Sequence, residues 1–450
     1  MVIIYMYYTI NEPDELLEFI NSQMKPKEKE KKENGEVFTP LSLVNEMLDK
    51  LDEAYIKEHG KSIFTEAGFK WFDPAVGIGN FFIIVYQRLM KGLFEYLPDE
   101  EERRKHILEQ MIYSAELTPK NVFIYKKIFC GDKYKLNIYE GDTLKMDIKS
   151  EFDVVLGNPP YQRKVGDRNT QPIWNLFVIF SFSLLKNDGY LVFVHPSGWR
   201  SPEGVFKNVL DLIQSKNLKY LCMNNYKKGQ EVFKVGTNFD YYVLHNKFDP
   251  NNITTITDID GKTYDKNINS WKFIPSGGFD LYDKILAKDG EEIVNVLYDR
   301  TSYGTDKKNM SKVNLLHSSS LYETRKDYMS NEKNEKFIYP CVYTITIRDG
   351  IKFFYSSVKH PKTEKKDMFV PKVIWSNGRA YPIVDVKGEY GLTQYSYAII
   401  DDVDNLKHIE TALNNPKFIE LMEYVKLNQN HKYNYRVISL FKKDFWKTFF

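Results

Sequence analysis

The segment Asn158-Pro159-Pro160-Tyr161 combines features that suit the handling of a planar amino group. It follows residues 152–157, an apolar run that predicts a buried strand. Two consecutive prolines fix two φ angles and remove two backbone donors, so the turn after this strand is rigid. The Asn158 side chain and the Pro159 carbonyl would be acceptors beside the flat ring of Tyr161. Such a loop could hold an –NH2 group while its nitrogen attacks an electrophile. A turn that only closes a core strand would need fewer of these residues.

A second candidate segment runs from Phe72 to Phe81, where a strand is expected to turn into a helix. Gly77 and Gly79 would let a bulky ligand approach the backbone, and the start of the helix offers N–H groups without an intrahelical partner. Asp73 precedes them, and a carboxylate at a strand end suits a ligand with a positive ammonium group rather than a pyrophosphate. A structural turn would explain both glycines, but it would not explain Asp73 as well.

Glu116 and Asp142 follow the next two expected strands. A carboxylate at such a strand end can accept hydrogen bonds from both hydroxyl groups of a ribose, as in dinucleotide-binding folds. Asp142 lies in the sequence Gly141-Asp142-Thr143-Leu144, where an aspartate could also be a helix cap or a turn former. The order and spacing of the two acids therefore carry more weight than either acid alone.

Short apolar strands alternate with helical segments between residues 35 and 246. The expected strands are Lys70–Phe72, Ile112–Ala115, Lys135–Glu140, Asp153–Leu156, Tyr190–His195, Tyr220–Asn224 and Tyr241–His245. The expected helices include Phe81–Tyr96, Asn121–Phe129, Ile173–Leu185 and Gly204–Ser215. This alternation predicts an α/β fold with a mainly parallel sheet and helices on both faces. Ligands in such folds bind beyond the carboxyl ends of the strands.

Changes in composition divide the sequence into three parts. Residues 1–34 are expected to form a short helix and a charged linker, in which lysines and glutamates interleave. Residues 35–249 contain the α/β pattern, and turn residues at 249–252 mark its expected end. Residues 250–450 predict a second, mixed α+β domain. Its expected elements are strands at Val342–Ile347 and Val373–Trp375 and helices at Asn405–Leu413 and Pro416–Tyr424.

The composition argues against several classes of protein. The net charge of the 450 residues is only +2, so any surface for nucleic acid must be local. Cys130, Cys222 and Cys341 lack metal-ligand spacing, so neither a zinc site nor a disulfide scaffold is expected. No apolar run is long enough for a membrane span, and the first residues lack the features of a signal peptide. We therefore expect a soluble, cytoplasmic protein.

Taken together, these motifs resemble those of the gamma-class (Taq-type) S-adenosylmethionine-dependent N6-adenine DNA methyltransferases, related to the modification enzymes of type II and type IIG restriction systems. The resemblance rests on Asn158-Pro159-Pro160-Tyr161, on residues 73–81 and on the order of the motifs along residues 35–245. The family usually has a cysteine where this chain has Val76. The resemblance implies a Rossmann-like methyltransferase sheet followed by a C-terminal target-recognition domain.

The resemblance also implies roles for individual positions. The residues implied to bind S-adenosylmethionine are Phe38, Thr39, Pro40, Asp73, Pro74, Ala75, Gly77, Gly79, Glu116, Leu117, Asp142, Thr143 and Asn158. Those implied to act on the target are Asn158, Pro159, Pro160, Tyr161 and Phe233. Phe233 would pack on the flipped adenine opposite Tyr161, although Phe239 could take that place and either could be a buried loop aromatic. Thr39 and Pro40 also have a local explanation, as the cap and the first position of a helix.

The implied activity is site-specific methyl transfer to N6 of a flipped-out adenine in double-stranded DNA. The implied partners are double-stranded DNA and a separate restriction endonuclease, with no membrane, and the chain would be a monomer or a weak dimer. RNA adenine or a protein glutamine stay open as substrates, because each presents a similar –NH2 group. A non-catalytic DNA-binding subunit of a restriction complex is a third reading.

The C-terminal part contains residue types that contact bases and phosphates, none of which is assigned a specific base. They are Asn377, Arg379, Lys387, Gln394, Lys426, Asn428, Gln429, Asn430 and Lys432. Asp349 and Glu364-Lys365-Lys366 have the spacing of a nuclease metal site, but such short charged triplets are common in a chain with 63 Lys and Arg. No cleavage activity is expected.

Overall fold

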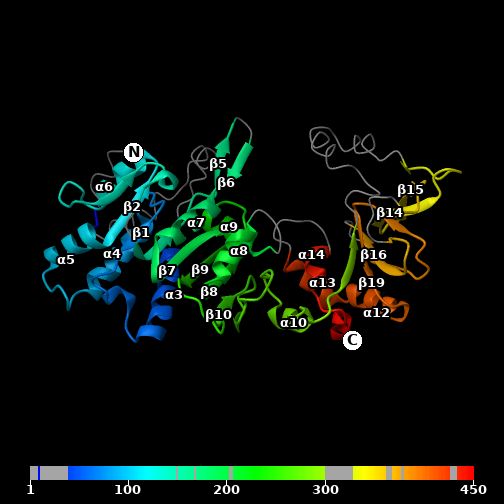
Figure 1. Ribbon diagram of the computed structural model, residues 1–450. Coiled ribbons are helices and arrows are strands. Elements are labelled where there is room, and N and C mark those ends of the chain that lie inside the picture. Colours follow the sequence, from blue (N-terminus) through cyan, green and yellow to red (C-terminus); the bar gives the residue numbers. More distant parts are fainter. Residues whose placement is uncertain are drawn as a thin grey trace. The chain divides into compact units, whose positions relative to one another are not determined.

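A computed structural model describes two compact units of the chain, Met1–Ile274 and Pro275–Phe450 (Figure 1). The described residues are 9–10, 39–147, 151–166, 169–201, 206–298, 328–360, 367–376, 380–425 and 433–450. The helix and linker expected within residues 1–34 therefore lie almost entirely outside the described residues. No helix in the described part of the chain is both long enough and apolar enough to cross a membrane.

The first unit is built on a nine-stranded sheet with the order β11-β10-β8-β9-β7-β4-β1-β2-β3. In chain order its strands are β1 (Trp71–Asp73), β2 (Ile112–Glu116), β3 (Asn137–Glu140), β4 (Phe152–Gly157), β7 (Leu185–Pro196), β8 (Asn217–Asn224), β9 (Phe239–His245), β10 (Thr254–Thr257) and β11 (Thr263–Lys266). All seven strands expected from the sequence are present, with ends that differ by a few residues.

The direction of the strands fixes where the candidate residues lie. β1 runs parallel to both of its neighbours, β2 and β4, and β3 continues the parallel run beside β2. The carboxyl ends of these four strands therefore share one edge of the sheet. After β1 the chain forms β2 on one side of that strand and later forms β4 on the other side. The strand order therefore reverses at β1, and α/β sheets bind ligands at such a topological switch point. β9 is antiparallel to both β7 and β8.

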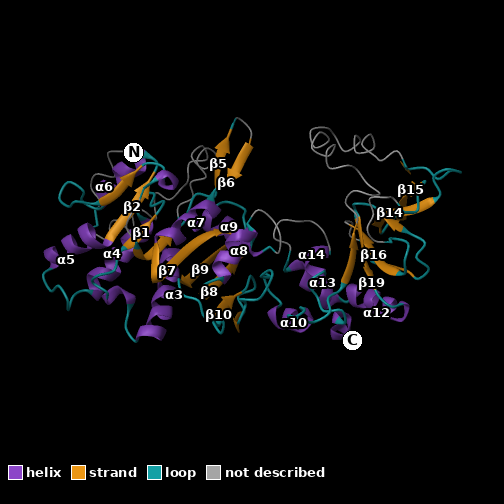
Figure 2. Ribbon diagram, in the orientation of Figure 1, coloured by secondary structure: helices purple, strands orange, loops and turns teal. Residues whose placement is uncertain are grey.

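Helices cover both faces of this sheet, as the sequence predicts (Figure 2). The apolar side chains of α3 (Leu41–His59) and α4 (Asn80–Gly92) form one core cluster with Tyr190, Val192 and Val194 of β7. The alternate residues of β7 face the other way and are also completely buried. On that side lie α7 (Trp174–Leu184), which contacts β7, and α8 (Lys207–Gln214), which contacts β8. The remaining helices of the unit are α5 (Glu100–His106), α6 (Pro119–Ile128) and α9 (Tyr226–Phe233).

The first unit ends after Ile274, not after residue 249 as the sequence suggested. The turn at residues 249–252 does not leave the sheet but returns the chain to it as β10, which runs parallel to β8. Asn252 and Thr254 both donate side-chain hydrogen bonds to the carbonyl of Leu218, at 2.8 and 2.7 Å. These polar residues, which look like a linker in the sequence, therefore fix a turn between two strands of the same sheet.

The second unit is a mixed α+β domain with two four-stranded sheets. One has the order β12-β19-β16-β17 and is antiparallel; the other has the order β13-β15-β14-β18. The strands are β12 (Asn295–Tyr298), β13 (Met329–Ser330), β14 (Tyr339–Thr346), β15 (Gly350–Ser356), β16 (Lys372–Ser376), β17 (Ile383–Asp385), β18 (Gly391–Leu392) and β19 (Ser396–Ile400). The helices are α10 (Phe279–Ile285), α12 (Val403–Asn414), α13 (Pro416–Glu423) and α14 (Tyr435–Ile438). The two strands and two helices expected here from the sequence match β14, β16, α12 and α13.

Candidate functional site

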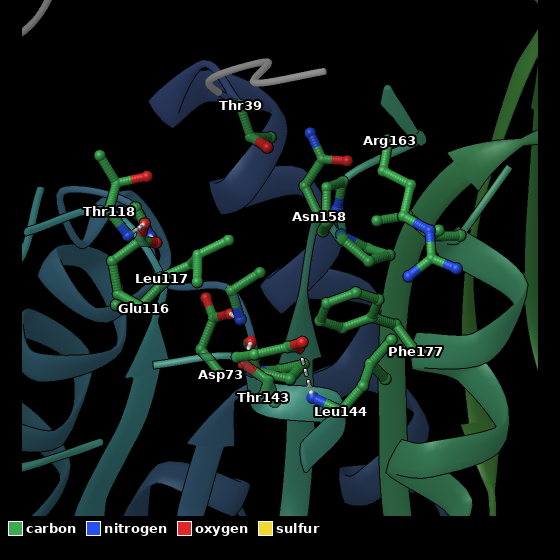
Figure 3. A pocket seen from close by; sticks show the side chains of 18 of the residues that line it. Thr39, Asp73, Glu116, Leu117, Thr118, Thr143, Leu144, Asn158, Arg163 and Phe177 are labelled. Atoms are coloured by element: carbon green, nitrogen blue, oxygen red, sulfur yellow. Dashed lines mark hydrogen bonds between the residues drawn. The ribbon is translucent and has the colours of Figure 1, made fainter. Parts of the chain in front are cut away.

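A cavity of about 590 Å³ opens at the shared carboxyl edge of β1, β2 and β4 (Figure 3). Most of the residues that the sequence assigned to a site line this cavity. They are Thr39, Asp73, Pro74, Ala75, Gly77, Glu116, Leu117, Asp142, Thr143, Asn158, Pro159 and Pro160. Pro40, Gly79, Tyr161 and Phe233 do not line it, and Phe38 lies outside the described residues. The strand order thus brings segments that are far apart in the sequence together at one edge of the sheet.

Asp73, the last residue of β1, places a buried carboxyl group in the cavity wall. Its Oδ1 accepts a hydrogen bond from the backbone N–H of Ala75 at 2.9 Å. Burial, the largest cause, and the nearby Glu116 carboxylate together raise the pKa of Asp73 to about 8, against the opposing effect of the Ala75 N–H. A ligand cation placed here would stabilise the charged form of this side chain.

The turn after β1 needs glycine at two positions. Gly77 and Gly79 have φ angles of 57° and 102°, values that residues with a side chain rarely adopt. A Cβ atom on Gly79 would lie 2.5 Å from the ring of Phe129, so this glycine also allows α4 to pack closely on the helix that follows β2. The role of Gly79 is therefore conformational, and it acts on the cavity only through the shape of the turn.

Glu116 ends β2 and connects that strand to the β1 turn. Its Oε2 accepts a hydrogen bond from the backbone N–H of Gly77 at 2.9 Å, and its Oε1 accepts one from the N–H of Thr118 at 2.8 Å. A longer contact of 3.4 Å comes from the side-chain amide of Asn121. Because an ionised carboxylate has about four acceptor positions, Glu116 keeps capacity for a ligand hydroxyl group.

Asp142 and Thr143 follow β3, and the structure gives both of them local bonds. Asp142 caps the short 3-10 helix η4 (Thr143–Lys145), because its Oδ1 accepts from the N–H of Leu144 at 3.2 Å. The Thr143 hydroxyl donates to the carbonyl of Pro74 at 2.7 Å and is buried. Thr143 therefore connects the β3 loop to the β1 loop, while Asp142 combines its capping bond with a place in the cavity wall.

Thr39 and Pro40 lie where α3 begins, but their local roles differ from those expected. Pro40 is the N-cap and Leu41 the first helical residue, since the N–H of Val44 donates to the carbonyl of Pro40. No side chain caps this helix. Instead, the carbonyl of the buried Thr39 accepts a hydrogen bond from Asn80 Nδ2 at 2.9 Å. The segment before α3 is thus held against the start of α4, beside the β1 turn.

Asn158 follows Gly157 at the end of β4 and is half-buried in the cavity wall, on the opposite side from Glu116 and Thr118 (Figure 3). Gly157 has a φ angle of 150°, and a Cβ atom built on it would lie 2.7 Å from Asp73 Oδ1. The backbone that leads into the Asn158 loop therefore lies directly against the Asp73 carboxyl group. This close approach joins the two motifs that carry the sequence argument.

The aromatic residues of the proposed target site form a group beside the cavity. The Tyr161 and Phe233 rings meet edge to face, with centroids 6.5 Å apart and an angle of 83°. Phe239 packs against Phe233 at 4.8 Å, and both phenylalanines are almost fully buried. Burial raises the pKa of Tyr161 well above its ordinary value, while the Asn158 side chain opposes this shift. Of the two phenylalanines, Phe233 is thus the ring next to Tyr161.

His195 lies away from the cavity. It is completely buried, its ring stacks on Trp174 at a centroid distance of 4.4 Å, and its Nε2 lies 3.1 Å from the hydroxyl of Tyr242. Burial lowers the pKa of His195 to about 4, so the ring is neutral near pH 7. These surroundings give His195 a structural role.

Several cavity residues were given no role of their own from the sequence. They are Asn80, Phe81, Thr118, Pro119, Leu144, Gln162, Arg163, Lys164, Ile173 and Phe177. Asn80 is buried, and its Oδ1 has no hydrogen-bond partner among the described residues. Its place directly after Gly79 is a usable signal, because it comes at the start of the helix that follows the glycine turn. Phe177 and Ile173 had no such signal, since they read as ordinary apolar positions of a helix.

The arrangement combines a buried acid, two further carboxylates at neighbouring strand ends and a proline-stiffened Asn158 loop in one cavity. The region that contains Glu116, Asp142 and the Asn158 loop resembles a known protein family. Residues 96–233 match the Eco57I restriction-modification methylase family. Over these residues, the resemblance to methyltransferases of restriction-modification systems is confirmed.

Two curated relatives are similar to this chain. A protein of Mycoplasma pneumoniae named an adenine-specific methylase is 25% identical in an alignment of 264 residues that covers 41% of this chain and 61% of that protein. The Escherichia coli protein RM.Eco57I, named a type II restriction enzyme and methyltransferase, is 22% identical over 488 residues, with coverage of 92% and 47%. The chain thus spans about half to three-fifths of the length of these relatives.

Solved structures with similar architecture include two from restriction-modification systems. The methyltransferase subunit of a type I system from Streptococcus thermophilus aligns with a TM-score of 0.41 at 15% identity, covering 62% of this chain and 62% of that chain. The type IIL enzyme MmeI, solved in complex with DNA, aligns with a TM-score of 0.46 at 12% identity, covering 89% and 67%.

Proposed function

We propose that this chain transfers a methyl group from S-adenosylmethionine to the N6 amino group of adenine in double-stranded DNA. One observation carries the proposal: the Asn158-Pro159-Pro160 loop lines the same cavity as Asp73 and Glu116. An amino-group holder and a set of carboxylates suited to a cationic nucleoside cofactor are therefore neighbours. A loop that only closed a core strand would not need these neighbours.

The residues of the cavity fit S-adenosylmethionine. A volume of about 590 Å³ lies within the range of small-molecule sites. Asp73 is a buried carboxyl group that forms no ion pair with a described side chain, and the neighbouring Asn80 Oδ1 is a buried acceptor without a described donor. Both suit the ammonium group of the cofactor, while Glu116 suits its ribose hydroxyls and the half-exposed Asp142 suits its adenine amino group.

The chain's own part in the reaction is to hold and orient the amino group. The bound cofactor supplies an electrophilic methyl group on a positively charged sulfur. The lone pair of an adenine amino group is delocalised into the ring, which makes the nitrogen a poor nucleophile. Asn158 Oδ1 and the Pro159 carbonyl would accept hydrogen bonds from the two N–H groups of this amine and draw the nitrogen toward a pyramidal geometry. Positioning and electrostatics then lower the barrier, and no general base is required before attack.

Reaching this nitrogen in a duplex requires the base to leave the stack. Unpairing and unstacking cost a few kcal/mol, which stacking on protein side chains partly offsets. Tyr161 follows the Asn158 loop directly, and its ring contacts Phe233, so we propose that these two rings receive the extruded adenine. Replacement of Phe233 by leucine should raise KM for DNA more than the same change at Phe239, which packs behind it.

We further propose that residues 275–450 recognise the DNA target. The relative named as a type II restriction enzyme and methyltransferase supports DNA over RNA or a protein glutamine as the substrate. Of the polar residues that the sequence proposed for this role, Lys387 and Gln394 belong to the described residues. Asn377, Arg379 and residues 426–432 lie outside them, as do residues 364–366 of the nuclease-like triplet.

Incorporation of labelled methyl groups into separate DNA, ribosomal RNA and protein fractions tests the proposal. We expect label in DNA at N6 of adenine, and sequencing of methylated DNA from expressing cells would give the target site. Asn158→Ala should lower the rate by at least about 100-fold, the cost of removing one positioned polar contact at a reacting group. Asn251→Ala, at an exposed turn of the same unit, serves as the matched control. Label in RNA or protein alone, or full activity of Asn158→Ala, would contradict the proposal.

A further inference from the structure

A two-stranded hairpin leaves the first unit immediately after the proposed catalytic loop (Figure 1). Its strands, β5 (Gln162–Val165) and β6 (Asn169–Pro172), pair only with each other, and every residue of both strands is exposed. Arg163 lies opposite Gln171, and its guanidinium donates a hydrogen bond to Gln171 Oε1 at 3.1 Å. The ribbon is therefore polar, solvated on both faces and free of any core of its own.

The base of this hairpin is attached to the catalytic loop. Gln162 follows Tyr161 in the chain, and at the other end the N–H of Ile173 donates to the carbonyl of Tyr161 at 3.2 Å. The hairpin thus begins and closes at the same residue. A ligand held by the ribbon would be held at a fixed position relative to Tyr161 and Asn158.

The charges around the cavity are divided between two sides. Asp73, Glu116 and Asp142 supply carboxyl groups at the ends of β1 to β3, whereas Arg163 and Lys164 line the cavity from the hairpin. In Figure 3, Arg163 lies beside Asn158, across the cavity from Glu116. Neither basic residue forms an ion pair with a described acidic side chain. A polyanion would be repelled by the carboxylate side and attracted to the hairpin side.

The shape of the hairpin also suits a duplex. The major groove of DNA admits a two-stranded β-ribbon, and lysine and arginine side chains are the usual partners of the flanking phosphates. The small net charge of +2 makes such a local basic element necessary for any attraction to nucleic acid. The position, shape and charge of the hairpin therefore all suit a DNA duplex.

We propose that the β5–β6 hairpin binds the DNA backbone beside the target nucleotide, with Arg163 and Lys164 contacting phosphates. The proposal rests on the proposed function, since it identifies the part of the first unit that holds the substrate strand. The competing anion is the carboxylate of the cofactor. We favour phosphate because both basic side chains stand on an exposed ribbon at the Asn158 side of the cavity, where the target amino group must arrive.

Salt-dependent binding measures the number of phosphates contacted. Equilibrium binding of the full chain to a duplex that contains the mapped target site would be followed from about 50 to 200 mM salt. Arg163→Gln and Lys164→Gln should each weaken binding by about tenfold and make the log–log salt slope shallower by about 1. Lys105→Gln, an exposed lysine on α5, is the matched control and should leave the slope unchanged. KM for DNA should rise in step with the weaker binding.

Three results would overturn the inference: a wild-type chain that fails to bind the duplex, hairpin variants with the wild-type salt slope, or a loss of cofactor affinity without a loss of DNA binding. The last result would assign the basic pair to the cofactor carboxylate. Because the slope comes from binding alone, it also separates the two proposals. A chain that binds the duplex with the expected slopes but transfers no methyl group would overturn the proposed function and support the hairpin contact.

Discussion

Asp73 in the first unit and Asp385 in the second are both almost completely buried, yet their surroundings differ. Asp385 pairs with the buried Lys372 at 2.7 Å and accepts hydrogen bonds from the N–H groups of Glu389 and Tyr390. Asp73 has one backbone donor, a second acid nearby and a cavity in front of it. One carboxylate completes a closed set of bonds between strands, while the other lacks a cation that a ligand could supply.

The comparison distinguishes a buried charge that is paired within the protein from one that could bind a ligand. In the second unit, burial lowers the pKa of Lys372, and the Asp385 carboxylate opposes that shift, so the pair is satisfied internally. In the first unit, burial and the neighbouring acid act in the same direction on Asp73. A buried group whose neighbours oppose its charged form is the better candidate for a site.

The largest expected effect comes from breaking the pair in the second unit. Lys372→Met should lower the free energy of unfolding by about 3–5 kcal/mol, because it leaves Asp385 buried without a cation. Hydrogen exchange at the β16 and β17 amides of the full chain would measure the loss. Lys372→Met combined with Asp385→Asn should recover at least half of it. An unchanged exchange rate in the single variant would show that the pair does not stabilise this unit.

The contact between the two motifs of the first unit can be broken at Gly157. Gly157→Ala places a methyl group 2.7 Å from Asp73 Oδ1 at a φ of 150°, so the Asn158 loop must move. Methyl transfer should fall by about 100-fold or more, since such displacement of a positioning group is costly. Gly261→Ala is the matched control, because Gly261 also has a positive φ but open space around it. Equal loss of activity in both variants would contradict the role of the contact.

Because Asp73 has no paired cation among the described side chains, we expect both the stability of the chain and its affinity for the cofactor to depend on pH. The folded-state pKa of about 8 lies above the ordinary value of 3.8, so the folded chain holds a proton that the unfolded chain releases. Stability without cofactor should therefore fall as pH rises from 4 to 8, and Asp73→Asn should abolish this fall. A cationic ligand would ionise Asp73, so the affinity for S-adenosylmethionine should rise by about tenfold per pH unit between pH 6 and 7.5.

Calorimetric titrations at several pH values measure this slope. Asp73→Asn should bind the cofactor about 10 to 100 times more weakly than the wild type at pH 7.5, with little dependence on pH. A variant that kept the wild-type slope would place the released proton on another group. The contrast between Asp73 and Asp385 would then lose its electrostatic basis.

A smaller effect is expected at Glu116, which raises the pKa of Asp73 less than burial does. Glu116→Gln removes the charge and leaves one amide oxygen, which can accept from only one of the two N–H groups, of Gly77 and Thr118, that the carboxylate binds. The midpoint of the pH profile of cofactor binding should move to lower pH, with an affinity loss of about tenfold from the weaker ribose contact. Glu109→Gln, an acid remote from the cavity, is the control. A midpoint that stayed in place would show that the two acids are not coupled.

Much of the first unit could be predicted, because parallel strands with buried faces produce apolar runs whose ends can be located in the sequence. Asp73, Glu116 and the Asn158 loop were selected in this way, and all three line the cavity. The boundary between the two units was placed too early in the sequence. The turn between β9 and β10 contains the same residue types as a linker. The contact of Gly157 with Asp73 joins residues 84 positions apart, and local sequence carries no signal for it. The start of α3 was predicted one residue too early. Pro40 is compatible with a helix start both as the N-cap and as the first helical residue.

The hairpin that starts and closes at Tyr161 has a consequence for how this chain can diversify. Residues inserted between β5 and β6 would lengthen the ribbon without stretching the backbone bond from Ile173 to Tyr161. The proposed reacting geometry and the proposed contact with the substrate strand could thus be altered independently. A library of ribbon lengths grafted at this point should yield enzymes with the same chemistry and different duplex preferences.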